Sequence, residues 1–375
     1  MKFFKHIVIS LVIILFISFS IFKKEVKDCK INLSYTINFK GDSLKNKLIG
    51  LKWALSYLGA ELPRGSFKNA ITISNNNSLS IDFSKLGFNV AAIQVIKQLT
   101  DSLKKTSEYS YKKSIDIGEF IAITIGVSEN YYAITGVKKT LSEFKKQYTF
   151  NNDLKFAVLN STVAFNNRVL HFSIDSSVSR QAYIAEESSG LVLDGNFVPE
   201  VFETFDIMNN GQLRFAIYNK NGDLIGASKS SLGEAGKPGK CLWCHEIVIS
   251  PLFKDTPDVP SYISKKHFNN LVKARMNNLN TFRRKLNSDI DFTKTQEHTQ
   301  MELLYISYME PSLLRLSQEW NMPIKTLKKL MKNKLTHTHN EFTFFGDIYH
   351  RNDGLEMAPY TLNKIPLSVR EDIEK

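Results

Sequence analysis

Cysteine is scarce in this chain, which has three among its 375 residues. Secreted domains that are stabilised by disulfides usually carry an even number of cysteines, so three do not make a disulfide framework. Cys241 and Cys244 form a C-x-x-C pair, and Cys29 is left over. A zinc site is also disfavoured, because no second C-x-x-C pair supplies the two further ligands that such a site needs.

The sequence signatures of several enzyme classes are lacking as well. The chain has no G-x-x-x-x-G-K-[ST] phosphate-binding loop, no G-x-G-x-x-G, no G-x-S-x-G and no H-E-x-x-H. Residues 233–241 come nearest to a phosphate-binding loop, but they have one residue too many and no Ser or Thr after the lysine. The sequence therefore assigns no chemistry to residues 29–229.

Residues 1–28 predict a signal peptide or an N-terminal membrane anchor. Lys2 and Lys5 precede an apolar run of 16 residues from Ile7 to Phe22. A short positive region before an apolar segment is typical of a secretory signal. The run is slightly short for a membrane-spanning helix, which needs about 20 residues. We expect a protein of the periplasm, or one that is membrane-anchored and faces the periplasm.

The chain has a positive net charge of +12, from 49 Lys and Arg against 37 Asp and Glu. This excess favours an anionic partner, although lysines spread along the chain are also typical of a solvated surface. Residues 313–335 resemble a helix-turn-helix, with lysines at helical spacing at Lys325, Lys328, Lys329 and Lys332. Because export argues against DNA, we expect no nucleic-acid partner. An acidic redox partner or lipid head groups would fit this face better than DNA, and an ordinary solvated helix face is the simplest interpretation.

Residues 29–229 predict an α+β domain with antiparallel strands. Asn-Gly pairs at residues 210–211 and 221–222 lie between β-type runs and predict a three-stranded antiparallel meander. Periodicity predicts further strands at residues 31–39, 78–83, 119–127 and 130–137, and helices at residues 43–59, 89–105 and 140–148.

Residues 230–240 are rich in Gly, Ser and Pro and read as a linker. After it the pattern becomes mostly helical, and we expect a separate α-helical domain over residues 241–375. Its helices are predicted at residues 259–286, 296–320, with Pro311 inside, and 322–335.

The strongest motif is Cys241-Leu242-Trp243-Cys244-His245, which matches the C-x-x-C-H sequence of haem attachment. Each thiol can add to one vinyl group of a porphyrin, and a helix over these residues brings the histidine beneath the iron. With three cysteines and eight histidines in the chain, chance would give this pattern roughly three times in ten thousand.

This stretch resembles the c-type cytochromes. The resemblance covers these five residues and does not extend to residues 29–229. It implies one covalent haem c at Cys241 and Cys244, with His245 as the proximal iron ligand. The same cysteines could instead form a thioredoxin-like redox pair, but that motif normally lies in a βαβ unit, and none follows here.

The second iron ligand is less clearly indicated. Met357 lies in a Met-plus-Pro segment before a C-terminal helix, as in small cytochromes c, but the proline is two residues on and His245 is 112 residues upstream. Met301 and Met309 have a more usual separation from His245, yet methionines at helical spacing are more often core residues.

A second group of chemically active side chains lies at residues 336–353. His337, His339 and Glu341 alternate, so on a strand they would point to one side, and His350 follows. They could hold a metal or present a histidine to the haem, although a polar loop with one structural histidine is the simpler interpretation.

We expect an exported mono-haem protein that transfers electrons. The alternatives are a haem enzyme with an open distal site for peroxide or small ligands, and a haem-free periplasmic dithiol protein.

Overall fold

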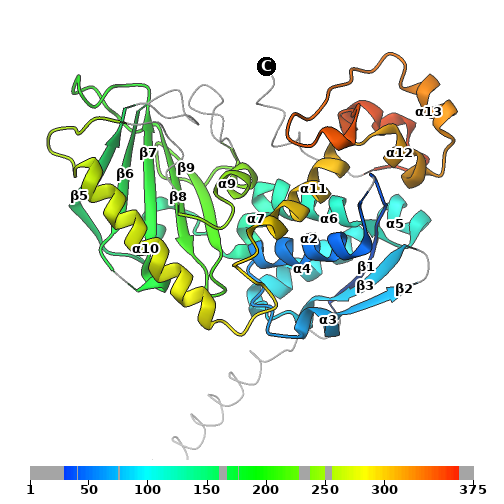
Figure 1. Ribbon diagram of the computed structural model, residues 1–375, viewed down its shortest axis with the longest axis horizontal. Coiled ribbons are helices and arrows are strands. Elements are labelled where there is room, and N and C mark those ends of the chain that lie inside the picture. Colours follow the sequence, from blue (N-terminus) through cyan, green and yellow to red (C-terminus); the bar gives the residue numbers. More distant parts are fainter. Residues whose placement is uncertain are drawn as a thin grey trace, which may run out of the picture.

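The computed structural model describes residues 29–39, 41–74, 77–159, 167–175, 177–227, 237–249 and 256–362. Figure 1 shows a five-stranded sheet, crossed on one face by the long helix α10 (Lys265–Lys285), beside a group of helices with a smaller sheet. The predicted mixture of helices and antiparallel strands is confirmed. The predicted signal segment lies outside the described residues.

The large sheet is an antiparallel meander in which each strand pairs with its neighbours along the chain. Asn210 and Gly211 form the predicted turn between its last two strands, and Gly211 has a φ of +80° that favours glycine. After Asn221-Gly222 the predicted third strand reduces to two isolated bridges, of Leu224 with Tyr218 and of Asp223 with Thr140. The strands are β5 (Phe150–Val158), β6 (Asn167–Ser173), β7 (Ala182–Ser188), β8 (Val201–Ile207) and β9 (Leu213–Asn219).

The smaller sheet has the order β2-β3-β1-β4. Its central strand β1 is antiparallel to β3 and parallel to β4. The predicted strand at residues 31–39 is shorter than expected, because β1 ends at Ser34. The strands are β1 (Lys30–Ser34), β2 (Ile71–Ser74), β3 (Ser78–Asp82) and β4 (Ile115–Asp116).

Capping residues start several helices where the sequence predicts them. Ser43, Asn89 and Thr140 each accept a hydrogen bond from the backbone N–H three residues on. Such a cap satisfies one of the N–H groups that a helix start leaves unpaired. The helices before residue 150 are α2 (Leu44–Tyr57), α3 (Ser66–Ala70), α4 (Val90–Leu103), α5 (Ser107–Lys112), α6 (Ile117–Ile121), α7 (Ser128–Thr135) and α8 (Leu141–Lys145).

The strands predicted at residues 119–127 and 130–137 are wrong, because both segments are helical. Helix α6 continues into a π-helical turn, η2 (Ala122–Gly126), and α7 follows it. Apolar runs this short do not distinguish a buried strand from a buried helix. Asp116 caps the first of these helices, since its carboxylate accepts the backbone N–H of Gly118 at 2.7 Å.

Residues 230–236 of the predicted linker lie outside the described residues, and residues 238–240 form the first turn of helix α9 (Pro238–His245). Hydrophobic residues that precede and follow this segment pack together. One hydrophobic cluster contains Leu33 of β1, Trp243 and Tyr305. Helix α10 also covers the large sheet, where the ring of Phe268 stacks on that of Phe156 with 4.1 Å between centroids. The remaining helices are α9 (Pro238–His245), α11 (His298–Met309), α12 (Leu313–Trp320) and α13 (Ile324–Leu330).

Two glycines allow α11 to approach the first half of the chain closely. A Cβ at Gly50 of α2 would lie 2.5 Å from the carbonyl oxygen of Gln300, and one at Gly118 of α6 would lie 2.5 Å from that of Leu304. Real Cβ atoms do not come so near to backbone atoms. Helix α11 therefore packs as an internal element between segments that precede it by more than 180 residues.

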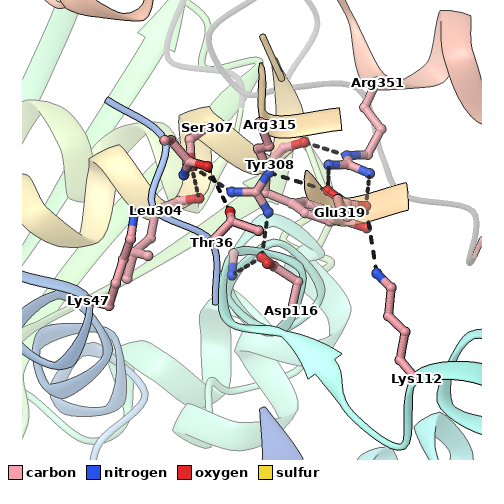
Figure 2. Close-up of polar contacts among 12 residues, drawn as sticks. Thr36, Lys47, Lys112, Asp116, Leu304, Ser307, Tyr308, Arg315, Glu319 and Arg351 are labelled. Carbon is pink, nitrogen blue, oxygen red and sulfur yellow. Dashed lines mark hydrogen bonds and ion pairs between the residues drawn. The ribbon is translucent and has the colours of Figure 1, made fainter. Parts of the chain in front are cut away.

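Buried ion pairs fasten α12 to this core, as Figure 2 shows. Arg315 of α12 contacts Asp116 at 2.7 Å and Glu319 at 3.3 Å. Arg351 donates to both oxygens of Glu319, at 2.8 and 2.7 Å. Lys112 approaches the same carboxylate at 3.9 Å. Paired in this way, the charges can lie in the interior without the cost of an uncompensated buried ion.

Candidate functional site

The C-x-x-C-H motif forms the last five residues of α9, so the helix expected there is confirmed. Pro238 lies in the first turn, where its missing N–H costs no hydrogen bond. Cys241, Cys244 and His245 stand at positions i, i+3 and i+4 and therefore share one side of the helix. In Figure 1, α9 lies between the large sheet and the helical group.

The side of α9 that carries His245 is directed at the large sheet. The imidazole ring contacts Phe205 of β8 and Phe215 of β9, with centroids 5.6 and 5.4 Å apart. These two phenylalanines are paired across the strands and point to the same face. They give the histidine an apolar wall that keeps water from this side of the ring.

The orientation of the His245 ring is set by one hydrogen bond. Its Nδ1 lies 3.3 Å from the carbonyl oxygen of Val248, and since a carbonyl only accepts, Nδ1 carries the proton. Burial lowers the pKa of His245 to about 4, and the positive charge of Arg168 acts in the same direction. At neutral pH the imidazole is therefore uncharged with Nε2 as the basic nitrogen, which is the form that binds metals.

The two cysteines of the motif differ in exposure. Cys241 is buried, Cys244 is exposed, and both are thiols. Burial raises the pKa of the Cys241 thiol well above its usual value, and the nearby Glu203 and Cys244 add to the effect. A thiol pair that exchanges disulfides rapidly needs a lowered pKa on its attacking cysteine. The environment of Cys241 instead raises its pKa, so Cys241 is not suited to be the attacking cysteine of such a pair.

Three charged residues of the large sheet lie beside the motif, and no pattern in the sequence indicates them. Arg168 of β6 forms ion pairs with Glu187 of β7 and with Glu203 of β8, the second at 3.5 Å. The Nε of Arg168 is buried and has no hydrogen-bond partner among the described residues. Only the strand register brings these side chains together, because they lie more than 35 residues before the motif.

The opposite side of α9 packs into the helical group. The ring of Trp243 lies 5.3 Å from that of Tyr305 and 6.3 Å from that of His298. Tyr57 donates its hydroxyl proton to the carbonyl of Glu246 at 2.5 Å and contacts Nδ1 of His298 at 2.9 Å. The end of the motif is thus anchored to α2 and α11.

The methionines considered as second iron ligands lie in other surroundings. Met357 ends the 3₁₀ helix η6 (Arg351–Met357) and packs against the cluster formed around Trp320 and Leu327. Cys241 belongs to the other, larger cluster. Met301 and Met309 are buried core residues of α11, which agrees with their simpler interpretation. The structure brings none of the three into contact with His245 among the contacts of the described residues, and the role of Met357 stays a prediction.

The histidines of residues 336–353 are held by separate interactions. Nε2 of His337 lies 2.9 Å from a carboxylate oxygen of Glu310, and its ring stacks on that of His350 at 4.5 Å. His339 is buried against Phe342, with ring centroids 5.0 Å apart, whereas Glu341 is exposed. Over the described ranges of the chain, no group of three or more His, Cys, Asp or Glu side chains is placed to hold a metal ion.

The predicted basic face is present on α13 and the turn after it. Lys325, Lys328, Lys329 and Lys332 are all exposed. On the other side of this segment, Leu327 and Met331 pack against Trp320 of α12. The helix pair therefore has an ordinary small core beneath a positively charged surface.

The chain matches no protein-family model, no curated protein and no solved structure. Among the described helices, none is both long enough and apolar enough to span a bilayer. The interpretation of the site therefore depends on its own chemistry.

Proposed function

We propose that this chain is an exported mono-haem c-type protein that transfers electrons. Cys241 and Cys244 would attach the haem, and His245 would be the proximal ligand of its iron. The observation that carries the proposal is the ring of His245, in which Nδ1 donates to Val248 and Nε2 is left as the basic nitrogen. A protein histidine that binds a metal normally has this arrangement, with the other ring nitrogen bonded to a carbonyl or carboxylate.

The spacing of the donor set supports this proposal, since the two thiols and the imidazole stand at positions i, i+3 and i+4 of α9. His245 faces the apolar residues Phe205 and Phe215, while Cys241 is buried and Cys244 is exposed. A bound haem c supplies an iron centre that takes up and releases one electron. The residues of the chain would then set its surroundings: the phenylalanines exclude water, Val248 fixes the imidazole, and Arg168 lies nearby with its charge paired to Glu187 and Glu203.

The raised pKa of Cys241 limits the haem-free dithiol alternative, since a protein of that kind would have to use the exposed Cys244 as its attacking thiol. The enzyme alternative, a haem with an open distal side, requires that no side chain occupies the second axial position. Carbon monoxide and imidazole distinguish this case: rapid binding to the resting haem favours an open site, and slow or absent binding favours a second protein ligand such as Met357.

The proposed location is the periplasm, either as a released protein or with the N-terminus retained in the membrane. The proposed partner is an acidic redox protein. The exposed lysines of α13 offer it a positively charged surface, which would steer association and make it sensitive to salt.

Haem staining of a denaturing gel tests the proposal directly. The full chain is expressed together with a cytochrome c maturation system, and as the Cys241→Ala/Cys244→Ala variant. Cys29→Ala is the matched control, because Cys29 is also buried but lies outside the motif. We expect a stained band at 42.8 kDa or slightly less for the wild type and the control, and no stain for the double variant. Well-expressed, exported protein without stain would exclude the haem assignment.

A further inference from the structure

A pocket of about 640 Å³ lies where the C-terminal end of α10 meets the segment that follows α9. Its lining includes Arg64, Val248, Met276, Arg283, Arg284 and Phe292. The pocket is separate from the thiols of the motif, which do not line it. Three of the residues named are arginines, and none of them forms an ion pair within the described parts of the chain.

Arg283 is the central group of this pocket. The residue is only 4% exposed. Its Nε donates to the carbonyl of Gly211 at 2.9 Å, and Nη1 donates to that of Ile247 at 2.5 Å. Its Nη2 is buried and has no hydrogen-bond partner among the described residues. A buried guanidinium with an unused donor and no carboxylate partner is costly unless a ligand compensates it.

Other buried arginines of this protein differ from Arg283 in their partners or in their place. Arg315 and Arg351 have carboxylate partners. Arg275, two turns before Arg283 on α10, has none, and its Nη1 is likewise buried without a hydrogen-bond partner among the described residues. Its guanidinium lies over the rings of Phe172 and Tyr183, however, and it does not line the pocket. Arg283 also lies over a ring, that of Phe292 at 4.5 Å, yet it faces a space large enough for a ligand.

The acidic residues at the pocket do not neutralise the arginines. The carboxylate of Asp289 accepts the backbone N–H groups of Gly65 at 2.7 Å and Phe67 at 2.9 Å. That of Asp291 accepts from the backbone and hydroxyl of Thr293. Both carboxylates therefore bond to local turns, although they keep their negative charge. The lining holds three arginines against two aspartates, so it keeps an excess of one positive charge, and Arg64 and Arg284 are exposed.

We infer that this pocket binds a small anionic molecule, in which a carboxylate or phosphate group is joined to an apolar or aromatic body. The anionic oxygens would accept from Nη2 of Arg283, with Arg64 and Arg284 adding attraction at the rim. Met276 and Phe292 provide an apolar surface for the body of the molecule. Burial lowers the pKa of Arg283 to about 10, so the guanidinium still carries its charge at neutral pH. This inference does not depend on haem attachment.

Isothermal titration calorimetry of the full chain tests the inference with benzoate and phenyl phosphate as probes, and benzyl alcohol as the uncharged control. We expect saturable binding of at least one anion and none of the alcohol. Binding of benzoate alone identifies a carboxylate ligand, and binding of phenyl phosphate alone identifies a phosphate ligand. Failure of both anions to bind the wild type, or equal binding of benzyl alcohol, would overturn the assignment.

Variants show whether the arginines are responsible. Arg283→Met is expected to abolish binding, but it also removes two hydrogen bonds of the fold, so its thermal unfolding is recorded alongside. Arg64→Gln/Arg284→Gln changes only exposed side chains and is expected to weaken binding about tenfold or more. The matched control is Lys285→Gln, which removes one exposed charge of the same helix outside the pocket. Equal weakening in Lys285→Gln, or unchanged binding in the double variant, contradicts the inference.

Discussion

Glu319 joins three cationic side chains in the interior of the protein (Figure 2). Both of its oxygens accept from Arg351, and Arg315 and Lys112 lie within 4 Å of them. Burial alone would raise the pKa of Glu319, but the charge of Arg351 outweighs it and holds the pKa well below its usual range. This carboxylate therefore stays ionised wherever the protein is folded under ordinary conditions.

We predict that Glu319→Gln lowers the free energy of unfolding by about 3–5 kcal/mol at pH 7, because it leaves buried guanidinium groups without their counter-charge. The wild type gains this contribution above the carboxyl pKa of the unfolded chain, about 4.3, and loses it as the pH falls further. Urea unfolding between pH 3 and 7 should therefore show a smaller pH dependence for the variant. Glu61→Gln, at an exposed position, is the control. An unchanged acid limb in Glu319→Gln would contradict this account.

At the scale of single elements, α10 connects the large sheet to the rest of the core. Phe268 stacks on Phe156 and also contacts Phe172, with ring centroids 4.1 and 5.8 Å apart. These contacts join the first turns of the helix to β5 and β6. At its other end, Arg283 is bonded to Gly211 and Ile247.

We predict that Phe268→Ala destabilises the protein by about 3–4 kcal/mol, as expected for the loss of a buried aromatic ring. Thermal unfolding followed by circular dichroism measures the effect. Asn270→Ala, two residues on and exposed, should leave the melting temperature nearly unchanged. Equal melting temperatures for the two variants would mean that α10 does not depend on this contact.

Local signals in the sequence predicted the elements that local interactions determine. The helices that follow Ser43, Asn89 and Thr140 and the turn at Asn210-Gly211 depend on short-range features, and each appears where expected. The prediction of strands at residues 119–127 and 130–137 was wrong, because the helical state of these residues depends on burial by other segments. For the same reason, the motif of α9 was visible in the sequence, whereas its neighbours Arg168 and Phe205 were not, since strand register alone places them there.

At the scale of the whole molecule, residues from both sides of the predicted linker share one core. Helix α11 lies against α2 and α6, where Gly50 and Gly118 leave room for it. Helix α10 covers the large sheet. A separated C-terminal segment would therefore expose the apolar faces of both helices to water.

We predict that a fragment of residues 237–375 does not fold alone, in contrast to the independent haem domain that composition suggests. Its amide proton spectrum should show the narrow dispersion of an unfolded chain, while the full chain gives a dispersed spectrum. The comparison is made for both without haem, because a bound cofactor stabilises the folded state. A well-dispersed spectrum from the fragment would show that its helices form a core of their own.

The order of strands in the large sheet has a consequence for how the protein folds. Since every strand pairs with its neighbour along the chain, the contacts of this sheet are short in sequence. Helix α2 instead packs against α11, which follows it by about 250 residues, so this contact is long in sequence. Short-range contacts form faster because less loop-closure entropy opposes them. The sheet is therefore expected to assemble early, and the docking of α11 to complete the fold late.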